Sequence, residues 1–449
     1  MDRSKQLGEE KIGKLLLKFS IPAIVGMLVN ALYNIVDRIF VGKGVSELAI
    51  TAITVAFPIS IIIMAFGMLV GIGAAATVSI KLGQKRKDEA EEILGNAFTL
   101  IIIVSLGVTI LGLIFMEPLL KIFGASEAAL PLAKQFISII LIGALLQNVG
   151  FGLNNIIRSE GNPKMAMSTM LIGAILNTIF NPIFIFVMHT GVRGSALATI
   201  VSQTVCSIWV IQYFTKGKST LKLKTKNFKL KKGIVRQIFS IGLSPFLMQL
   251  AASVITIILN KGLATYGGDT AIAAMGIINS VSMLILMPIF GINQGAQPII
   301  GFNYGAKNFA RVKKALKLAI LAATTISTTG FILVELFPRQ IIGIFISGTG
   351  SELLSIGSRG IRIYLMMLPI IGFQIVSSNY FQAVGKAKIS IFLSLSRQVI
   401  VLLPLIIILP QILKLDGVWI AGPSSDFIAS LITGMFLIRE LRKLENKSI

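Results

Sequence analysis

Apolar residues in this chain are gathered into long runs, and short polar gaps separate one run from the next. Each run is long enough to cross a lipid bilayer as a helix, because about 20 apolar residues suffice. The pattern therefore predicts an all-α membrane protein with twelve transmembrane helices. We expect these helices over residues 14–41, 50–80, 92–116, 131–157, 164–188, 191–215, 236–262, 271–300, 311–336, 355–382, 388–411 and 416–440.

The pattern repeats after about 223 residues. Pro22 matches Pro245, and Gly83 matches Gly305, each within a similar local sequence. Six predicted spans separate matching positions. Because six is an even number, both halves cross the membrane in the same direction. We therefore predict two pseudo-symmetric six-helix bundles, related by an axis along the membrane normal.

A lysine-rich segment divides the two repeats. It predicts an N-terminal lobe over residues 1–215, a basic cytoplasmic linker over 216–232 and a C-terminal lobe over 233–449. Lysine and leucine alternate in the linker, which is also compatible with an edge strand. We expect a solvated connector held near anionic lipid.

Composition supports the membrane interpretation. The 449 residues are 54% hydrophobic and only 14% charged, with a formal net charge of +23. The cations lie in the gaps between spans, and no aromatic residues alternate with them as a base-stacking surface requires. We therefore expect no nucleic-acid partner. Cations favour the cytoplasmic side, which places both termini inside. The opposite gaps hold only scattered cations such as Arg339 and Lys414.

Asp37 is an acid within the first predicted span, and the matching position of the repeat is Asn260. An acid at the middle of a span costs about 2.5–3.5 kcal/mol, so it is rare without a function. Burial favours its protonated form, which makes it a candidate for ion coupling. Arg38 points about 100° away on a helix and need not neutralise it. The alternative is an interfacial acid that meets water.

Amides gather on the fourth and fifth spans. Asn177 and Asn181 share one helix face because they are four residues apart. Such amides either join helices or bind a cation. Thr199 on the sixth span is expected either to join them or to bond its own helix. The candidate ion-coupling residues are Asp37, Asn154, Asn177, Asn181 and Thr199.

The second half offers weaker candidates. Asn293 and Gln297 share a face of the eighth span, beyond a predicted kink at Pro288. We expect them either to line a substrate cavity or to pack against polar neighbours. Adaptable methionines also suit varied ligands, although core packing is their commoner role. The candidate substrate-cavity residues are Asn260, Met287, Asn293 and Gln297.

Other polar and aromatic positions have structural interpretations. Asp426 is expected either to cap a helix after Pro423 or to pair with Arg397 or Arg362, and we favour the pair. Glu335 falls at an outward span end, where we expect it to be solvated. Trp419 lies near a span end and is expected to anchor the membrane interface. There is no phosphate-binding loop of the Walker type and no metal-ligand motif in the sequence. Transport against a gradient would then need an ion gradient.

Several motifs together resemble the multidrug and toxic compound extrusion (MATE) family, in the bacterial branch of DinF-like and MepA-like proteins. The similarity extends over nearly the whole chain. The motifs are Phe19-Ser-Ile-Pro22, Asn34-Ile-Val-Asp37-Arg-Ile-Phe-Val-Gly42, Arg158-Ser-Glu-Gly-Asn-Pro163, Asn177-Thr-Ile-Phe-Asn-Pro182, Gly295-Ala-Gln-Pro298 and Gly417-Val-Trp-Ile-Ala-Gly-Pro423.

The resemblance implies two lobes around a central cavity that opens to one side at a time. It implies export of organic cations and amphipathic drugs in exchange for H+ or Na+. No cofactor beyond that ion is expected, and Na+ at Asp37 would be the only metal. It further implies a monomer, not an enzyme, in contact with the lipids of the bacterial inner (cytoplasmic) membrane.

The family's first-lobe site matches Asp37, with Asn154, Asn177 and Thr199 as neighbours, and its helix bend matches Pro22. The chain departs from the family at Asn181, where many members carry a second Asp. This departure leaves the identity and number of coupling ions open.

Two other functions are compatible with the spans. A lipid or lipid-linked saccharide flippase of the same superfamily would favour a strongly cationic lumen. Few cations lie well inside the predicted spans, among them Arg38, Arg362 and Arg397. A non-transporting scaffold would have no use for broken helices and intramembrane polar groups. We therefore favour the antiporter.

Overall fold

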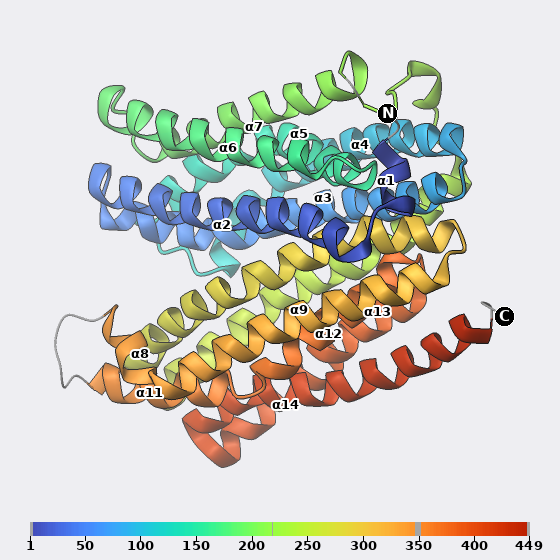
Figure 1. Ribbon diagram of the computed structural model, residues 1–449. Coiled ribbons are helices and arrows are strands. Elements are labelled where there is room, and N and C mark those ends of the chain that lie inside the picture. The colour runs from blue at the N-terminus through green and yellow to red at the C-terminus, as the bar shows by residue number, and fades with distance from the viewer. Residues whose placement is uncertain (1–2, 218, 346–351, 447–449) are drawn as a thin grey trace. The chain divides into compact units, whose positions relative to one another are not determined.

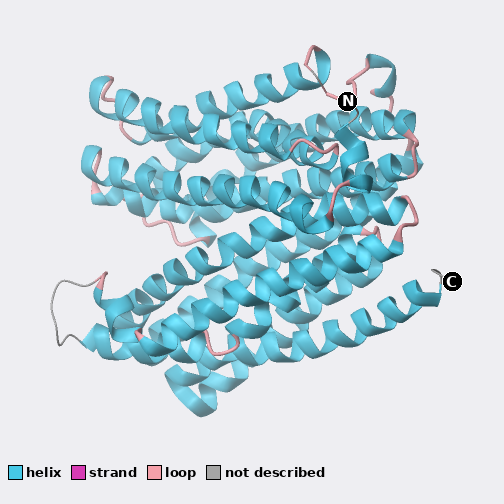
Figure 2. Ribbon diagram, viewed as in Figure 1, coloured by secondary structure: helices cyan, strands magenta, loops and turns pink. Residues whose placement is uncertain are grey.

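The structure of the protein is a computed structural model that describes residues 3–217, 219–345 and 352–446. Every regular element within these ranges is helical, and none is a strand (Figure 2). The predicted all-α class is confirmed.

Helices of the first repeat follow the predicted spans closely (Figure 1). A short α1 precedes them, and α6 continues into a π-helical turn, η1. The bounds are α1 Arg3–Glu9, α2 Ile12–Gly44, α3 Glu47–Gly83, α4 Lys87–Ile122, α5 Leu130–Ser159, α6 Pro163–Pro182, η1 Ile183–Val187 and α7 Val192–Thr215.

The second repeat has the same plan with more interruptions. A single 3₁₀ turn, η2 (Thr225–Asn227), precedes it in the linker. The bounds are α8 Lys232–Gly305, α9 Phe309–Leu336, α10 Pro338–Gly343, α11 Glu352–Tyr364, α12 Leu368–Ala383, α13 Ala387–Leu395, the π-helical η3 Ser396–Leu402 and α14 Leu403–Asn446.

Breaks inside the longest helices explain how fewer than twelve continuous helices can supply the twelve predicted spans. Nine helices of the described chain are long and apolar enough to cross a membrane, and α11 with α12 forms a tenth span bent by 47°. Within α8, Gly268 has a φ of 60°, and within α14, Lys414 has a φ of 52°. A helix cannot continue straight through such torsions, so α8 and the continuous helical segment Ala387–Asn446, which comprises α13, η3 and α14, each supply two spans.

The chain packs as two compact units. The first comprises the residues up to Glu10, Val25–Gln249 and Gly301–Ala306. The second comprises Lys11–Ile24, Leu250–Ile300 and the chain from Lys307 onward. These units do not coincide with the predicted lobes over residues 1–215 and 233–449. The beginning of α2 packs within the second unit, and the beginning of α8 packs within the first.

Glycines account for the packing of α8 in the first unit. A Cβ added at Gly242 would lie 1.7 Å from the carbonyl oxygen of Leu69 on α3. One added at Gly73 would lie 2.1 Å from the carbonyl oxygen of Ile238. Only glycine permits such backbone approach, as is common between membrane helices.

Matching glycines repeat this packing elsewhere. An added Cβ at Gly83 would lie 1.9 Å from the carbonyl oxygen of Phe302, and one at Gly305 would lie 2.1 Å from that of Ile80. In the second unit, an added Cβ at Gly295 would approach Ser20 to 2.6 Å. The start of α2, the first spanning helix of the first repeat, therefore packs in the second unit. The start of α8, the first helix of the second repeat, packs in the first unit.

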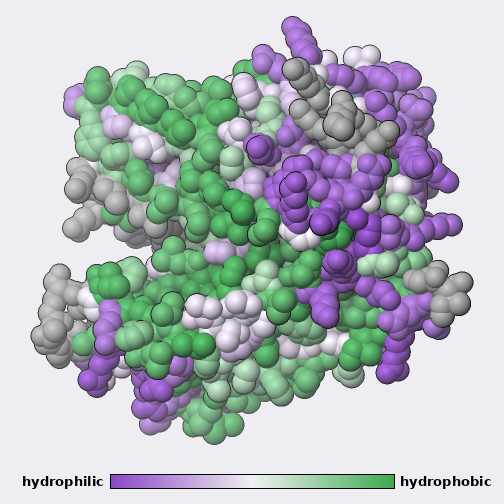
Figure 3. Space-filling view, in the orientation of Figure 1, coloured by the Kyte–Doolittle hydropathy of each residue, from purple (hydrophilic) through white to green (hydrophobic). Residues whose placement is uncertain are grey.

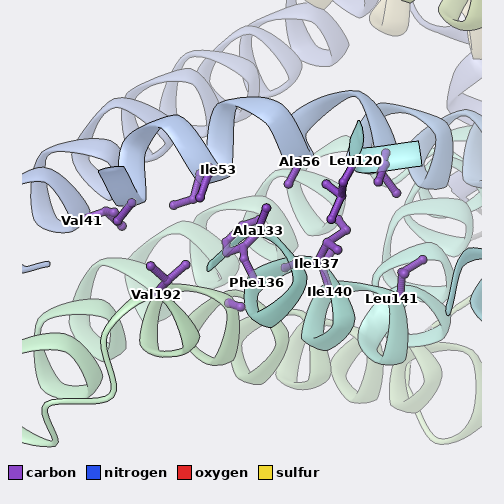
Figure 4. Packing of buried hydrophobic residues seen from close by; sticks show 14 of the residues in the cluster. Val41, Ile53, Ala56, Leu120, Ala133, Phe136, Ile137, Ile140, Leu141 and Val192 are labelled. Carbon is purple, nitrogen blue, oxygen red and sulfur yellow. The ribbon is translucent and has the colours of Figure 1, made fainter. Parts of the chain in front are cut away.

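The apolar core of the first unit joins helices far apart in sequence. Figure 4 shows Val41 of α2, Ile53 of α3, Leu120 of α4, Ile137 of α5 and Val192 of α7 packing on one another. All five are buried. This core fixes the ends of α2 and α7 relative to α5, at the end of the unit opposite the lysine-rich linker.

The linker is anchored on α4. Asn96 donates to the carbonyl oxygens of Asn227 (3.1 Å) and Lys229 (3.3 Å) and accepts from the amide of Lys231 (2.7 Å). Leu221 is fully buried. Lys229 and Lys231 remain exposed, so the linker is solvated along much of its length, as predicted, but it is anchored where its backbone bonds to the buried Asn96 amide.

Two ion pairs add to this anchor at the surface, and in one of them Lys231 Nζ bonds to Glu92 Oε1 over 2.7 Å. The ammonium of Lys224 bonds to the buried carboxylate of Glu91. This hydrogen bond raises the pKa of Lys224 above its usual value, so the lysine stays charged near neutral pH.

Replacing Asn96 with Ala is expected to destabilise the first unit by about 1–3 kcal/mol, because linker backbone groups lose their partner inside the protein. The measurement is thermal unfolding of purified protein in detergent. Thr256→Ala is the control, since among the described residues this exposed hydroxyl bonds only to the Ala252 carbonyl of its own helix. Equal melting temperatures for the two variants would contradict the anchoring role.

Candidate functional site

Asp37 lies about two helical turns before the end of α2, and it is half-buried. Close packing at this end of the unit brings two other helices to it. An added Cβ at Gly44 would lie 2.4 Å from Ile185 of η1, and one at Gly194 would lie 3.1 Å from the backbone of Phe184. Both α2 and α7 therefore pack tightly against η1, the segment that follows α6.

Two neutral side chains hold the Asp37 carboxylate. The amide nitrogen of Asn181, at the end of α6, donates to its Oδ1. The hydroxyl of Ser195, in the first turn of α7, donates to the same oxygen over 2.9 Å. Asn181 and Ser195 are fully buried. These bonds orient the carboxylate, but neither donor supplies a positive charge.

A second polar layer lies one helical turn away on α6 and α7. Asn177 donates through Nδ2 to the hydroxyl of Thr199 over 3.1 Å. The Thr199 hydroxyl also donates to the backbone carbonyl of Ser195 over 3.1 Å. Both interpretations of Thr199 from the sequence are therefore confirmed, since it bonds to its own helix and to an amide of α6.

One buried oxygen in this cluster is unsatisfied. Asn181 Oδ1 has no hydrogen-bond partner within the described part of the chain. A buried acceptor without a partner is costly. Together with the carboxylate of Asp37 and the hydroxyls of Ser195 and Thr199, it makes a group of oxygen atoms. Hard cations prefer oxygen ligands, and a proton also binds to a carboxylate, so either ion suits the cluster chemically.

Asn154 is placed elsewhere. Its Nδ2 donates to the carbonyl of Ala166 over 2.9 Å, and its Oδ1 accepts from Arg158 over 2.8 Å. Ala166 is separated from Asn181 by about 20 Å along α6. The described bonds therefore do not bring Asn154 to Asp37. Its side chain is held by the Ala166 carbonyl, near the start of α6, and by Arg158, near the end of α5.

Ser195 was missed by the sequence reasoning. It lies four residues before Thr199 on α7, on the same helix face. That spacing was the signal that could have identified it. The side chain of Arg38 lies outside the described residues, so the prediction that it points away from Asp37 stays a prediction.

The second-half candidates lie along α8, on both sides of its break at Gly268. Asn260 is exposed on the first segment, whereas Met287, Asn293 and Gln297 are half-buried on the second. Gln297 Nε2 is buried and has no hydrogen-bond partner within residues 3–217, 219–345 and 352–446. Their role in substrate binding stays a prediction.

Asp426 and Glu335 each form an ion pair with an arginine. Arg397 Nε donates to Asp426 Oδ1 over 2.6 Å, which confirms the predicted structural pair. Arg362 Nε donates instead to Glu335 Oε2 over 2.7 Å. Glu335, which was expected to be solvated, keeps a side chain that is 26% exposed, and its arginine partner is 57% exposed.

Comparison with known proteins identifies the family. A sequence model of the MatE family matches residues 22–183 and 245–408, more than half of the chain. The chain is also 27% identical over 434 residues to the multidrug export protein MepA of Staphylococcus haemolyticus. The alignment covers 97% of this chain and 95% of that relative.

Solved structures agree. The chain is similar to a MATE protein crystallised in the bent conformation, with a TM-score of 0.93, 26% identity and coverage of 100% of this chain and 99% of that one. It is similar to an outward-facing multidrug resistance MATE family transporter of the MOP superfamily, with a TM-score of 0.91, 26% identity and 98% coverage of both. The chain therefore belongs to the MatE family and is a multi-pass membrane transporter rather than an enzyme.

Proposed function

We propose that the protein exports organic cations and amphipathic drugs from the bacterial cell in exchange for H+ or Na+, which binds at Asp37. The relatives named as multidrug export proteins support the substrate class. Both termini then lie in the cytoplasm, where the positive-inside rule places the lysine-rich gaps.

The unsatisfied Asn181 Oδ1 beside the Asp37 carboxylate carries this proposal. A cation bound between them would satisfy the acceptor and neutralise the acid in one step. Ser195 and Thr199 supply further oxygens, while Asn177 orients Thr199. We leave Asn154 out of the proposed site because its described bonds go to Ala166 and Arg158.

Pro22 supports a conformational change coupled to the ion. Proline lacks the N–H that would bond to the preceding turn, so it weakens the helix there. Within α2, the chain passes from the second unit to the first between Ile24 and Val25, directly after Pro22. A bend at this point would change how the two ends of α2 pack. Ion binding at Asp37, on the same helix, would then bias the bend.

The substrate is proposed to contact the second half as well. Asn260, Met287, Asn293 and Gln297 would offer amides and a polarisable thioether to ligands of varied shape. The buried Gln297 Nε2 would donate to an acceptor on the ligand.

Transport in proteoliposomes with one imposed gradient at a time tests the function. We expect a fluorescent organic cation to be expelled when either a pH or a Na+ gradient is imposed, and the effective gradient names the coupling ion. Movement of the dye under neither gradient would contradict ion-coupled export. Translocation of a fluorescent lipid without a gradient would favour the flippase instead.

A further inference from the structure

A second polar site lies in the second unit, away from the Asp37 cluster of the first unit in sequence. The cavity has a volume of about 580 Å³ and lies where the end of α9, α10 and α11 meet. Three arginines line it: Arg339, Arg359 and Arg362. Figure 3 shows a hydrophilic patch over this end of the unit, where Figure 1 labels α11.

The sequence of α11 builds one wall of this cavity. Ser355, Ser358, Arg359 and Arg362 follow the spacing i, i+3, i+4, i+7, so they share one helix face. All four line the cavity. The opposite face is packed, and an added Cβ at Gly360 would lie 2.9 Å from the ring of Trp419. The polar stripe is thus held toward the cavity.

The arginines are only partly neutralised. Arg362 pairs with Glu335 over 2.7 Å, and Arg359 pairs with Asp416 over 2.5 Å. Each of these contacts uses one of the five N–H donors of a guanidinium. The side chain of Arg339 makes no ion pair or hydrogen bond within the described ranges. Three arginines against two acids leave a positive charge and many unused donors.

A buried hydroxyl points to a ligand. Ser358 is 8% exposed, lines the cavity and has no hydrogen-bond partner for its Oγ within the described residues. Buried hydroxyls are normally bonded. An oxygen-rich anion in the cavity would accept from this hydroxyl and from the arginines together.

The location adds to the argument. Most cations of this chain lie in the gaps at the other end of the spans, as the positive-inside rule requires. Charge clustered at the opposite end is not explained by that rule. Two exposed apolar residues lie between the lining residues Glu335 and Pro338: Leu336 (64%) at the end of α9 and Phe337 (46%) directly after it. A ligand with an anionic head and an apolar tail matches both surfaces.

We propose that this cavity binds the phosphate group of an anionic phospholipid of the outer leaflet, with Arg339, Arg359 and Ser358 as donors. Arginine binds phosphate through two parallel N–H groups, and the flanking Leu336 and Phe337 would contact the acyl chains. The proposal concerns a lipid site and does not depend on which ion or drug the protein transports.

The test uses the purified full-length chain in detergent. Added phosphatidylglycerol is expected to raise the melting temperature more than phosphatidylcholine does. Arg339→Gln, which breaks no described bond, should need about tenfold more phosphatidylglycerol for the same rise, as expected for loss of one charged hydrogen bond. Arg236→Gln removes an exposed arginine of α8 outside the cavity and should behave as the wild type.

Ser358→Ala separates binding from a structural role. Because its hydroxyl bonds to no described group, the melting temperature without lipid should be unchanged, while the gain from phosphatidylglycerol falls. Equal gains in the wild type, Arg339→Gln and Arg236→Gln would overturn the proposal. An equal, Arg339-dependent gain with inorganic phosphate alone would keep the phosphate chemistry and overturn the lipid as its source.

Discussion

Replacing Asp37 with Asn is expected to reduce gradient-driven efflux in proteoliposomes to the level of protein-free vesicles. The amide has nearly the same shape as the carboxylate, and it can still accept hydrogen bonds from Asn181 and Ser195. It neither binds a proton near neutral pH nor attracts a cation by charge. The variant should therefore fold normally and lose only its response to the gradient.

Asp269→Asn is the matched control, because Asp269 is an exposed acid on α8. Its efflux should equal that of the wild type, and both variants should melt at the wild-type temperature. If Asp37→Asn protein pumps at the wild-type rate under the effective gradient, the coupling role of Asp37 is wrong.

Replacing Gly242 with Ala is expected to destabilise the first unit by about 3 kcal/mol or more and to abolish efflux. The added methyl would lie 1.7 Å from the carbonyl oxygen of Leu69, so α3 and α8 must separate by roughly 1.5 Å or more to restore ordinary contact. Overpacking of this kind commonly costs about 1–3 kcal/mol, and here the obstacle is backbone that cannot rotate away.

Gly276→Ala on the same helix is the control. An added Cβ there meets no atom within 4 Å, so helix propensity alone should act and stabilise the protein by about 0.5–1 kcal/mol. The two variants should therefore shift the melting temperature in opposite directions. A shift of the same sign in both would show that the contact between α3 and α8 does not constrain the fold.

The apolar runs predicted the spans well because membrane helices must satisfy their backbone internally over a fixed thickness. Helix breaks were harder to locate. A gap was expected between residues 262 and 271, and the helix instead continues except at Gly268. Trp419 was expected at the membrane interface, yet it is 1% exposed. The notch at Gly360 that receives its ring depends on tertiary packing.

The site was predictable only in part. The pair Asn177 and Asn181 follows from helical spacing, and their contacts with Thr199 and Asp37 join α6 to α7 and α2. The placement of Asn154 was not predictable, because its partner is a backbone carbonyl and leaves no trace in the sequence. The cavity beside α11 was likewise unforeseen, since Arg339 and Arg362 lie 23 positions apart.

The glycine contacts between repeats bear on how such a molecule can be made. The first unit needs Gly301–Ala306 and the start of α8, which are synthesised after its other helices. The second needs the start of α2, which is synthesised before every other part of that unit. Neither half-chain produced alone carries all the parts of a unit, so a half-length ancestor would have assembled only as an interlaced homodimer.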